Sequence, residues 1–157
     1  MKYSQKYTIV AFTESIEPNY EFAMGNWPLH ITLADTFAVE LNETLVQNLK
    51  KLLALLSQID LSIGNNTTLG TTKVALIDKN NALQGLHNRV VDLLESSGAK
   101  FNNPEFTRAG FLPHITNLKS FDLQLGDTVR LKTISVIDMF PDGNWQQRKV
   151  LNSFELK

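Results

Sequence analysis

A short pattern that occurs twice is the feature that most constrains how this chain folds. Residues 28–37 (PLHITLADTF) and residues 113–121 (PHITNLKSF) share the sequence His-Ile-Thr, followed after three positions by Thr or Ser and then Phe. Alternate side chains of an extended strand point to the same face. Each copy therefore predicts a strand that presents its histidine and threonine together and turns its isoleucine toward a core.

The duplication sets these histidines apart from an ordinary strand histidine. A lone His-x-Thr is commonly a half-buried ring beside a β-branched neighbour, without any chemical role. Here the two copies contain two of the three histidines in the chain. We therefore predict that His30, Thr32, His114 and Thr116 belong to one site.

Length and composition favour one globular unit. A chain of 157 residues with 43% hydrophobic side chains can bury a sizeable core, so we expect a single domain over residues 1–157. The absence of cysteine excludes disulfides and thiolate metal sites. The formal net charge of −1 argues against non-specific coating of nucleic acid, and no DNA partner is expected. Because neither a signal peptide nor an apolar membrane-length span is evident, we expect a cytoplasmic protein without a membrane partner. We also expect a monomer.

The first half of the chain combines β-forming stretches with one amphipathic helix. Asn42 can cap a helix whose leucines recur at helical spacing up to Leu56. The acidic connection over residues 14–27 is long and rich in aromatics, as segments that border a site often are. Gly64-Asn65-Asn66 predicts a turn between two strands. The predicted strands of this half cover residues 7–13, 29–37, 59–63 and 69–77.

The second half repeats the combination of helix and motif strand. A helix that starts at Asn80 or the next residue and stops at Gly98 carries one apolar face. His87 lies at the edge of that face, and we interpret it as structural. The apolar residues around Leu131 and Ile134 are out of phase by one position, which predicts a β-bulge. The remaining predicted segments are a motif strand over residues 111–118, a turn over 140–144, and a final hairpin strand over 150–156.

This order of elements indicates an α+β fold. Each half contributes one motif strand and one amphipathic helix. We therefore expect two pseudo-symmetric lobes of mainly antiparallel sheet plus helices, arranged around a central cleft where the motif strands meet.

Two histidines across a cleft can act as an acid and base pair. An unperturbed imidazole pKa near 6.5 lets one ring be neutral while the other is protonated. The threonine hydroxyls beside them can donate hydrogen bonds to oxygens. A phosphodiester offers such oxygens, an attacking oxygen that loses a proton and a leaving oxygen that gains one. The residues alone do not assign which ring is the base.

These features resemble the 2H phosphoesterase superfamily, which includes bacterial 2′-5′ RNA ligase and 2′,3′-cyclic phosphodiesterase proteins. The resemblance rests on the paired motifs, their separation, the proline before the second histidine and the strand and helix context, and it covers nearly the whole chain. It implies two lobes related by a pseudo-twofold axis and hydrolysis of cyclic phosphodiesters without metal or cofactor. By the same resemblance, His30 and His114 are general acid and base, and Thr32 and Thr116 hold the phosphate.

The implied substrate is the 2′,3′-cyclic phosphate of a nucleotide or an RNA end, with 2′-5′ ligation as a possible companion activity. Further phosphates could be met by cationic side chains, and a base could stack on an aromatic ring. The cationic candidates are Arg108, Lys119, Arg130 and Arg148, and the aromatic ones are Trp27 and Tyr20. For each of them, an ordinary surface charge or core aromatic is the more common explanation.

Two other classes of function fit the same sequence. One is a non-catalytic module that binds RNA ends or nucleotides in the same groove. The other is a metalloenzyme with His30, His87, His114 and a carboxylate as ligands, although no clustered metal-binding spacing is present.

Overall fold

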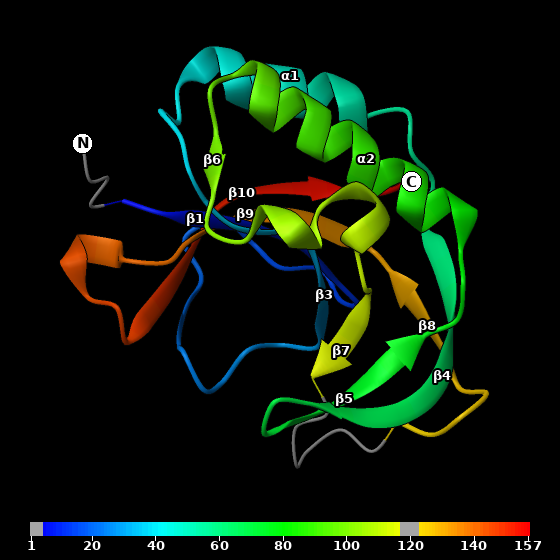
Figure 1. Ribbon diagram of the computed structural model, residues 1–157. Coiled ribbons are helices and arrows are strands. Elements are labelled where there is room, and N and C mark those ends of the chain that lie inside the picture. The colour runs from blue at the N-terminus through cyan, green and yellow to red at the C-terminus, as the bar shows by residue number, and fades with distance from the viewer. Residues whose placement is uncertain (1–4, 117–122) are drawn as a thin grey trace.

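Two antiparallel sheets form the frame of the molecule in the computed structural model, which describes residues 5–116 and 123–157 (Figure 1). The larger sheet has six strands in the order β2-β10-β9-β1-β3-β6, and the smaller has four in the order β7-β5-β4-β8. The strands of the larger sheet are β1 (Tyr7–Phe12), β2 (Glu21–Ala23), β3 (His30–Ala38), β6 (Lys100–Phe101), β9 (Thr133–Asp138) and β10 (Gln147–Glu155). Those of the smaller sheet are β4 (Ile59–Leu69), β5 (Thr72–Ile77), β7 (His114–Thr116) and β8 (Thr128–Leu131).

Two helices cover one face of the larger sheet. Helix α1 (Glu43–Leu53) begins where the Asn42 side chain accepts a hydrogen bond from the Leu45 backbone N–H at 2.9 Å. Helix α2 (Asn81–Ser96) begins in the same way, because the Asn80 side chain accepts from the Leu83 N–H at 3.0 Å. Both predicted N-caps are therefore confirmed. Three short 3₁₀ turns complete the described elements: η1 (Pro104–Phe106), η2 (Arg108–Gly110) and η3 (Pro141–Gly143).

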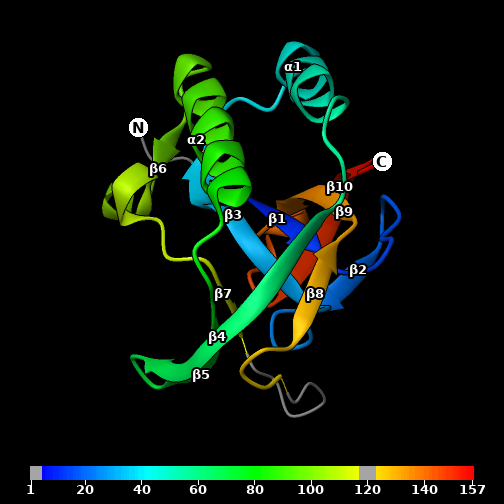
Figure 2. The ribbon, with the colours of Figure 1, turned by 90° about the vertical axis from the view of Figure 1, so that its right-hand side faces the viewer.

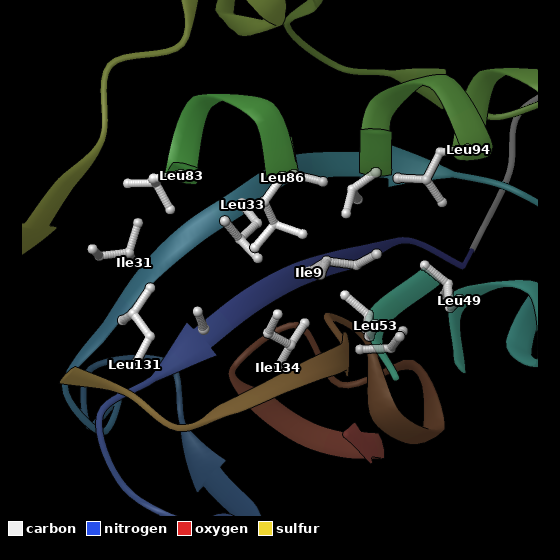
Figure 3. Close-up of a cluster of buried hydrophobic side chains, with 14 of the residues drawn as sticks. Ile9, Ile31, Leu33, Leu49, Leu53, Leu83, Leu86, Leu94, Leu131 and Ile134 are labelled. Atoms are coloured by element: carbon white, nitrogen blue, oxygen red, sulfur yellow. The ribbon is translucent and has the colours of Figure 1, made fainter. Parts of the chain in front are cut away.

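Strand β1 lies at the centre of the sheet and is buried on both faces. Ile9 and Ala11 face the helices and join the main core, which Figure 3 shows between α1, α2 and the strands. Val10 and Phe12 point to the opposite face and pack in a smaller cluster with Phe22 of β2. Because helices seal one face and the β2 hairpin segment seals the other, the central strand is held without exposure to water.

The smaller sheet extends away from the helices. Figure 2 shows α1 and α2 on one side of the molecule and the β4–β5 hairpin reaching out at the opposite end. Strand β7, at the edge of the smaller sheet, contacts β3 of the larger sheet. The predicted α+β fold with two lobes of antiparallel sheet is therefore confirmed, and the two motif strands meet where the lobes adjoin.

The predicted turn at Gly64-Asn65-Asn66 is wrong, because β4 continues through it to Leu69. A register shift between Ile63 and Asn66 in the β4–β5 pair marks an irregularity there instead. A Cβ on Gly64 would lie 2.8 Å from Oδ1 of Asp78, so the glycine permits close approach of the neighbouring strand. The chain turns later, at Gly70, whose φ of +62° suits glycine.

The β-bulge predicted around Leu131 and Ile134 is also wrong. The change of phase arises because the chain passes from one sheet to the other: β8 pairs with β4 in the smaller sheet and β9 pairs with β1 in the larger. Lys132 alone separates the two strands, and its backbone N–H donates to the Phe12 carbonyl at 2.8 Å. The predicted final hairpin is confirmed, since β10 pairs antiparallel with β9.

Two short strands were not predicted from the sequence, and several strand boundaries differ from the prediction. Strands β2 and β6 have three and two residues, too few to show the alternation of apolar and polar side chains that predicts a strand. The second motif strand starts at His114 instead of Phe111, and its predicted end at residues 117–118 lies outside the described residues. None of the helices in the described part of the chain is long and apolar enough to span a membrane.

Helix packing offers a matched test of the core. Leu49 of α1 is 1% exposed, whereas Leu55, just beyond the same helix, is 89% exposed. Leu49→Ala should lower the free energy of unfolding by about 2–5 kcal/mol, because it removes buried methyl groups and leaves a cavity. Leu55→Ala should change it by less than about 0.5 kcal/mol. Urea unfolding of both variants checks this, and equal effects would contradict the described burial.

Candidate functional site

The first motif strand and the second open onto a common cavity. A cavity of about 330 Å³ is lined by His30 and Thr32 of β3 and by Thr116 of β7. Ile31 and Ile115, between the lining residues, are both fully buried. The alternation predicted from the motif is therefore confirmed at the level of geometry, and two threonine hydroxyls from separate sheets share one cavity with an imidazole.

A second cavity shares Thr32 with the first. It has a volume of about 380 Å³ and is lined by His114 of β7 together with residues of β3, α2 and the η1–η2 region. Thr32 and Asp35 line both cavities. We call these two neighbouring hollows the groove: His30 lines one, His114 lines the other, and Thr32 and Asp35 line both.

Both motif histidines are oriented by the same backbone contact. Nδ1 of His30 lies 2.8 Å from the Pro28 carbonyl, and Nδ1 of His114 lies 2.8 Å from the Leu112 carbonyl. A carbonyl oxygen can only accept, so each Nδ1 carries a proton and donates it. In the neutral ring this leaves Nε2 with a lone pair. Each histidine is therefore held in the tautomer that can take up a proton at Nε2.

The environment of His30 lowers its basicity. Its ring lies against Trp27, with ring centroids 4.5 Å apart, and meets Phe12 in an edge-to-face arrangement with ring centroids 6.1 Å apart. The His30 pKa is lowered to about 4, chiefly by burial; the hydrogen bond to Pro28 opposes this shift, and the electrostatic effect of His114 adds a smaller lowering. The two imidazoles thus sense each other electrostatically. At neutral pH, His30 is an uncharged ring.

Asp35 is a groove residue that the sequence prediction missed. Simple alternation along β3 would place Asp35 opposite Thr32, because they are three positions apart. The β1–β3 pairing has register shifts between Tyr7 and Ile9 and between Ile9 and Val10, each with an extra residue on β3. These bulges change the alternation and bring the Asp35 carboxylate to the groove. The signal available in the sequence was only a charged residue inside an otherwise uncharged strand.

The aromatic connection predicted to border a site does so. Met24, Gly25 and Trp27 line the first cavity. Behind the indole, the Arg148 guanidinium carbon lies 5.9 Å from the Trp27 ring centroid. Arg148 also donates to the carbonyls of Met139, Trp145 and Gln147, and burial lowers its pKa. Arg148 therefore supports the Trp27 wall and does not itself line either cavity. Tyr20 stacks on Phe22 farther along the same aromatic row.

The other predicted cationic contacts lie elsewhere. The Arg108 guanidinium pairs with Asp92 and Glu95 of α2. Arg130 of β8 pairs with Asp60 of β4 through two hydrogen bonds. Lys119 lies outside the described residues. Thus the structure brings neither Arg108 nor Arg130 to the lining of the two cavities.

His87 is buried, as its structural interpretation predicted. It is 1% exposed, and its Nδ1 donates to the Leu33 carbonyl at 2.6 Å. Its Nε2 accepts the Arg108 backbone N–H at 2.9 Å, and its ring stacks on Phe111 with centroids 3.8 Å apart. His87 therefore ties β3 to the segment that leads into the second motif. With both nitrogens engaged, it has no lone pair for the three-histidine metal site.

The arrangement suits proton transfer around a bound oxyanion. Two imidazoles, each with a fixed tautomer, flank threonine hydroxyls that can donate to ligand oxygens. Within residues 5–116 and 123–157, no group of three or more His, Asp or Glu side chains is placed to hold a metal ion.

Comparison with known proteins agrees with this geometry. A family model described as the 2′-5′ RNA ligase superfamily matches residues 7–146. Among solved structures, a protein titled a phosphoesterase superimposes with a TM-score of 0.60 at 16% identity, covering 98% of both chains. The Escherichia coli protein LigT, solved with 3′-AMP, gives 0.59 at 17% identity, and its ATP complex gives 0.56 at 14%, each covering 98% of both chains.

The structural likeness, at such low identity, establishes a common fold. No curated protein sequence matches the chain. The match of the family model is therefore the stronger link, since it spans both motifs from β1 to the segment before β10.

Removing the Trp27 ring tests the cause of the lowered His30 pKa. Trp27→Ala should admit water to the ring and raise the His30 pKa from about 4 toward 6.5, because the charged form is then better solvated. NMR titration of the imidazole Hε1 signal measures this without any substrate. Trp145→Ala is the matched control, since Trp145 is 57% exposed and should leave the His30 pKa unchanged. A wild-type His30 that titrates near 6.5 would contradict the described burial.

Proposed function

The chain belongs to the 2′-5′ RNA ligase superfamily, and from that premise we propose that it is a metal-independent phosphodiesterase acting on 2′,3′-cyclic phosphates of nucleotides or RNA ends. Family membership supports a phosphoesterase-type function. The observation that carries the finer proposal is the grouping of His30, Thr32 and Thr116 around one cavity, with His114 just beyond Thr32.

In this proposal His30 is the general base. Its low pKa keeps the ring neutral, and its Nδ1–H is committed to Pro28, so Nε2 is the atom that accepts a proton. Nε2 removes a proton from water as the water oxygen bonds to phosphorus. A base whose pKa lies well below neutrality is always in its active form at pH 7, although its driving force for proton transfer is smaller.

His114 takes the complementary role. As the bond from phosphorus to one ribose oxygen breaks, protonated His114 donates its Nε2 proton to that oxygen, which leaves as a hydroxyl group. Thr32 and Thr116 donate hydrogen bonds to the non-bridging phosphate oxygens, where negative charge is held in the transition state. Water is consumed, one P–O bond forms and one breaks, and the two imidazoles exchange protonation states before returning them through solvent.

The ligands of related structures favour a nucleotide as the substrate class. Solved structures of LigT hold 3′-AMP and ATP. The second candidate function, a non-catalytic module that binds nucleotides or RNA ends, uses the same groove and differs only in turnover.

Replacing either motif histidine should nearly abolish hydrolysis. We expect His30→Ala and His114→Ala each to lower kcat on 2′,3′-cyclic nucleotides by about 10²–10⁴-fold, the usual contribution of one acid or base. Circular dichroism checks that the variants fold. Activity should persist with a chelator present, and a panel that includes 2′,5′-linked dinucleotides reports whether ligation chemistry accompanies hydrolysis. Binding of nucleotides without turnover by the wild type would instead support the non-catalytic module.

The threonines offer a finer test, because serine keeps the hydroxyl and alanine removes it. Thr116→Ala should reduce kcat by up to about 10²–10³-fold, as loss of one oxyanion donor does, whereas Thr116→Ser should retain most of it. Steady-state kinetics of the pair separates loss of the donor from loss of packing. Equal losses in the two variants would speak against a hydrogen bond from Thr116 to the phosphate.

A further inference from the structure

The cavity beside His114 differs in character from the one beside His30. Most of its wall is apolar, and Phe106 and Leu112 at its edge are 52% and 50% exposed. Phe111 also lines this cavity, and its ring stacks on His87. Exposed aromatic and aliphatic side chains around a hollow of about 380 Å³ suit a planar apolar group that enters from solvent.

One carboxylate, that of Asp35, lies among the apolar residues that line this cavity. Apart from the histidines, Asp35 is the only ionisable side chain among the described residues that line either cavity. Its Oδ1 accepts the Thr36 backbone N–H at 2.9 Å, and its Oδ2 accepts from the Asn103 side chain at 3.4 Å. These contacts fix the plane of the carboxylate. Each oxygen retains a lone pair, so both can accept from a ligand.

We propose that the cavity beside His114 is a nucleobase site that selects guanine through the Asp35 carboxylate. The inference rests on the proposed function, in which the phosphate lies at the Thr32 wall. Thr32 and Asp35 line the same two cavities, so a base attached to that phosphate through its ribose has the carboxylate within its own part of the groove.

Guanine fits a carboxylate because of the order of groups on its Watson–Crick edge. Its N1–H and N2–H₂ are adjacent donors, which match the two acceptor oxygens of one carboxylate. The other bases place an acceptor beside their donor: adenine has N1 next to N6–H₂, cytosine has N3 next to N4–H₂, and uracil has carbonyls on both sides of N3–H. An acceptor facing a carboxylate is repelled, so these bases keep at most one favourable contact.

Replacing Asp35 by asparagine should remove the preference and not merely weaken binding. The side-chain amide offers one acceptor and one donor, which complement the adjacent donor and acceptor that each of the four bases presents. Asp35→Asn should therefore lose the guanine preference and bind the four bases with similar affinity. A role of Asp35 in folding alone would reduce binding of all bases together.

Binding of the four nucleoside 3′-phosphates, measured by isothermal titration calorimetry, tests the proposal without requiring turnover. The wild type should bind guanosine 3′-phosphate about 10- to 100-fold more tightly than the adenosine, cytidine and uridine compounds. Asp142→Asn is the matched control, because it makes the same change at an exposed residue of η3 that lines neither cavity and should preserve the ratios. Phe106→Ala should weaken all four alike.

The outcomes separate this inference from the proposed function. Affinities for the four compounds within about twofold of one another would overturn the guanine site, even if cyclic nucleotides are hydrolysed. A guanine preference without hydrolysis would support the site while contradicting the phosphodiesterase proposal. If Asp35→Asn does not fold, the wild-type ratios alone decide, and an unchanged guanine preference in a folded Asp35→Asn protein would also overturn the inference.

Discussion

The site depends on one hydrogen bond that is made twice, from a histidine Nδ1 to the carbonyl two residues before it. His30 makes it to Pro28 and His114 makes it to Leu112, both at 2.8 Å. Because the contact joins residues two positions apart, it can form in either sheet, independently of the strands that pair with the motif. It fixes the ring orientation and the tautomer before any ligand arrives, and so it removes a conformational cost from the chemistry. Without this bond, the cavity would contain the same side chains with no defined proton-accepting atom.

Equal motifs become unequal through their surroundings. The first lies in the larger sheet, where Trp27 and Phe12 enclose its imidazole and burial lowers the His30 pKa. The second lies at the edge of the smaller sheet, beside the second cavity. Duplication thus supplies two copies of one local geometry, and tertiary packing gives the two rings different environments. The motif alone does not contain this difference, so it could not assign a separate role to each ring.

Local signals in the sequence predicted most of the fold. The caps at Asn42 and Asn80, the strand alternation around Ile31 and the order of elements all depend on neighbours in the chain. The errors arose where distant partners decide. Gly64 predicts a turn by its residue type, but its actual role is to allow close approach of the chain at the end of β5. The bulges that bring Asp35 into the groove exist only in the pairing of β3 with β1. Arg108 likewise carried a charge suited to phosphate, but two carboxylates on α2 pair with it.

The passage of the chain between the sheets at Lys132 has a mechanical consequence. One residue spans only about 3.5 Å, and this one is also hydrogen-bonded to Phe12, so the lobes are fastened together at that point. The two sheets therefore cannot move apart at this connection. A change in the width of the groove would have to come from rotation of one sheet relative to the other about Lys132. Substitutions near Lys132, far from either imidazole, would therefore change the distance between the two rings more than the chemistry of the rings.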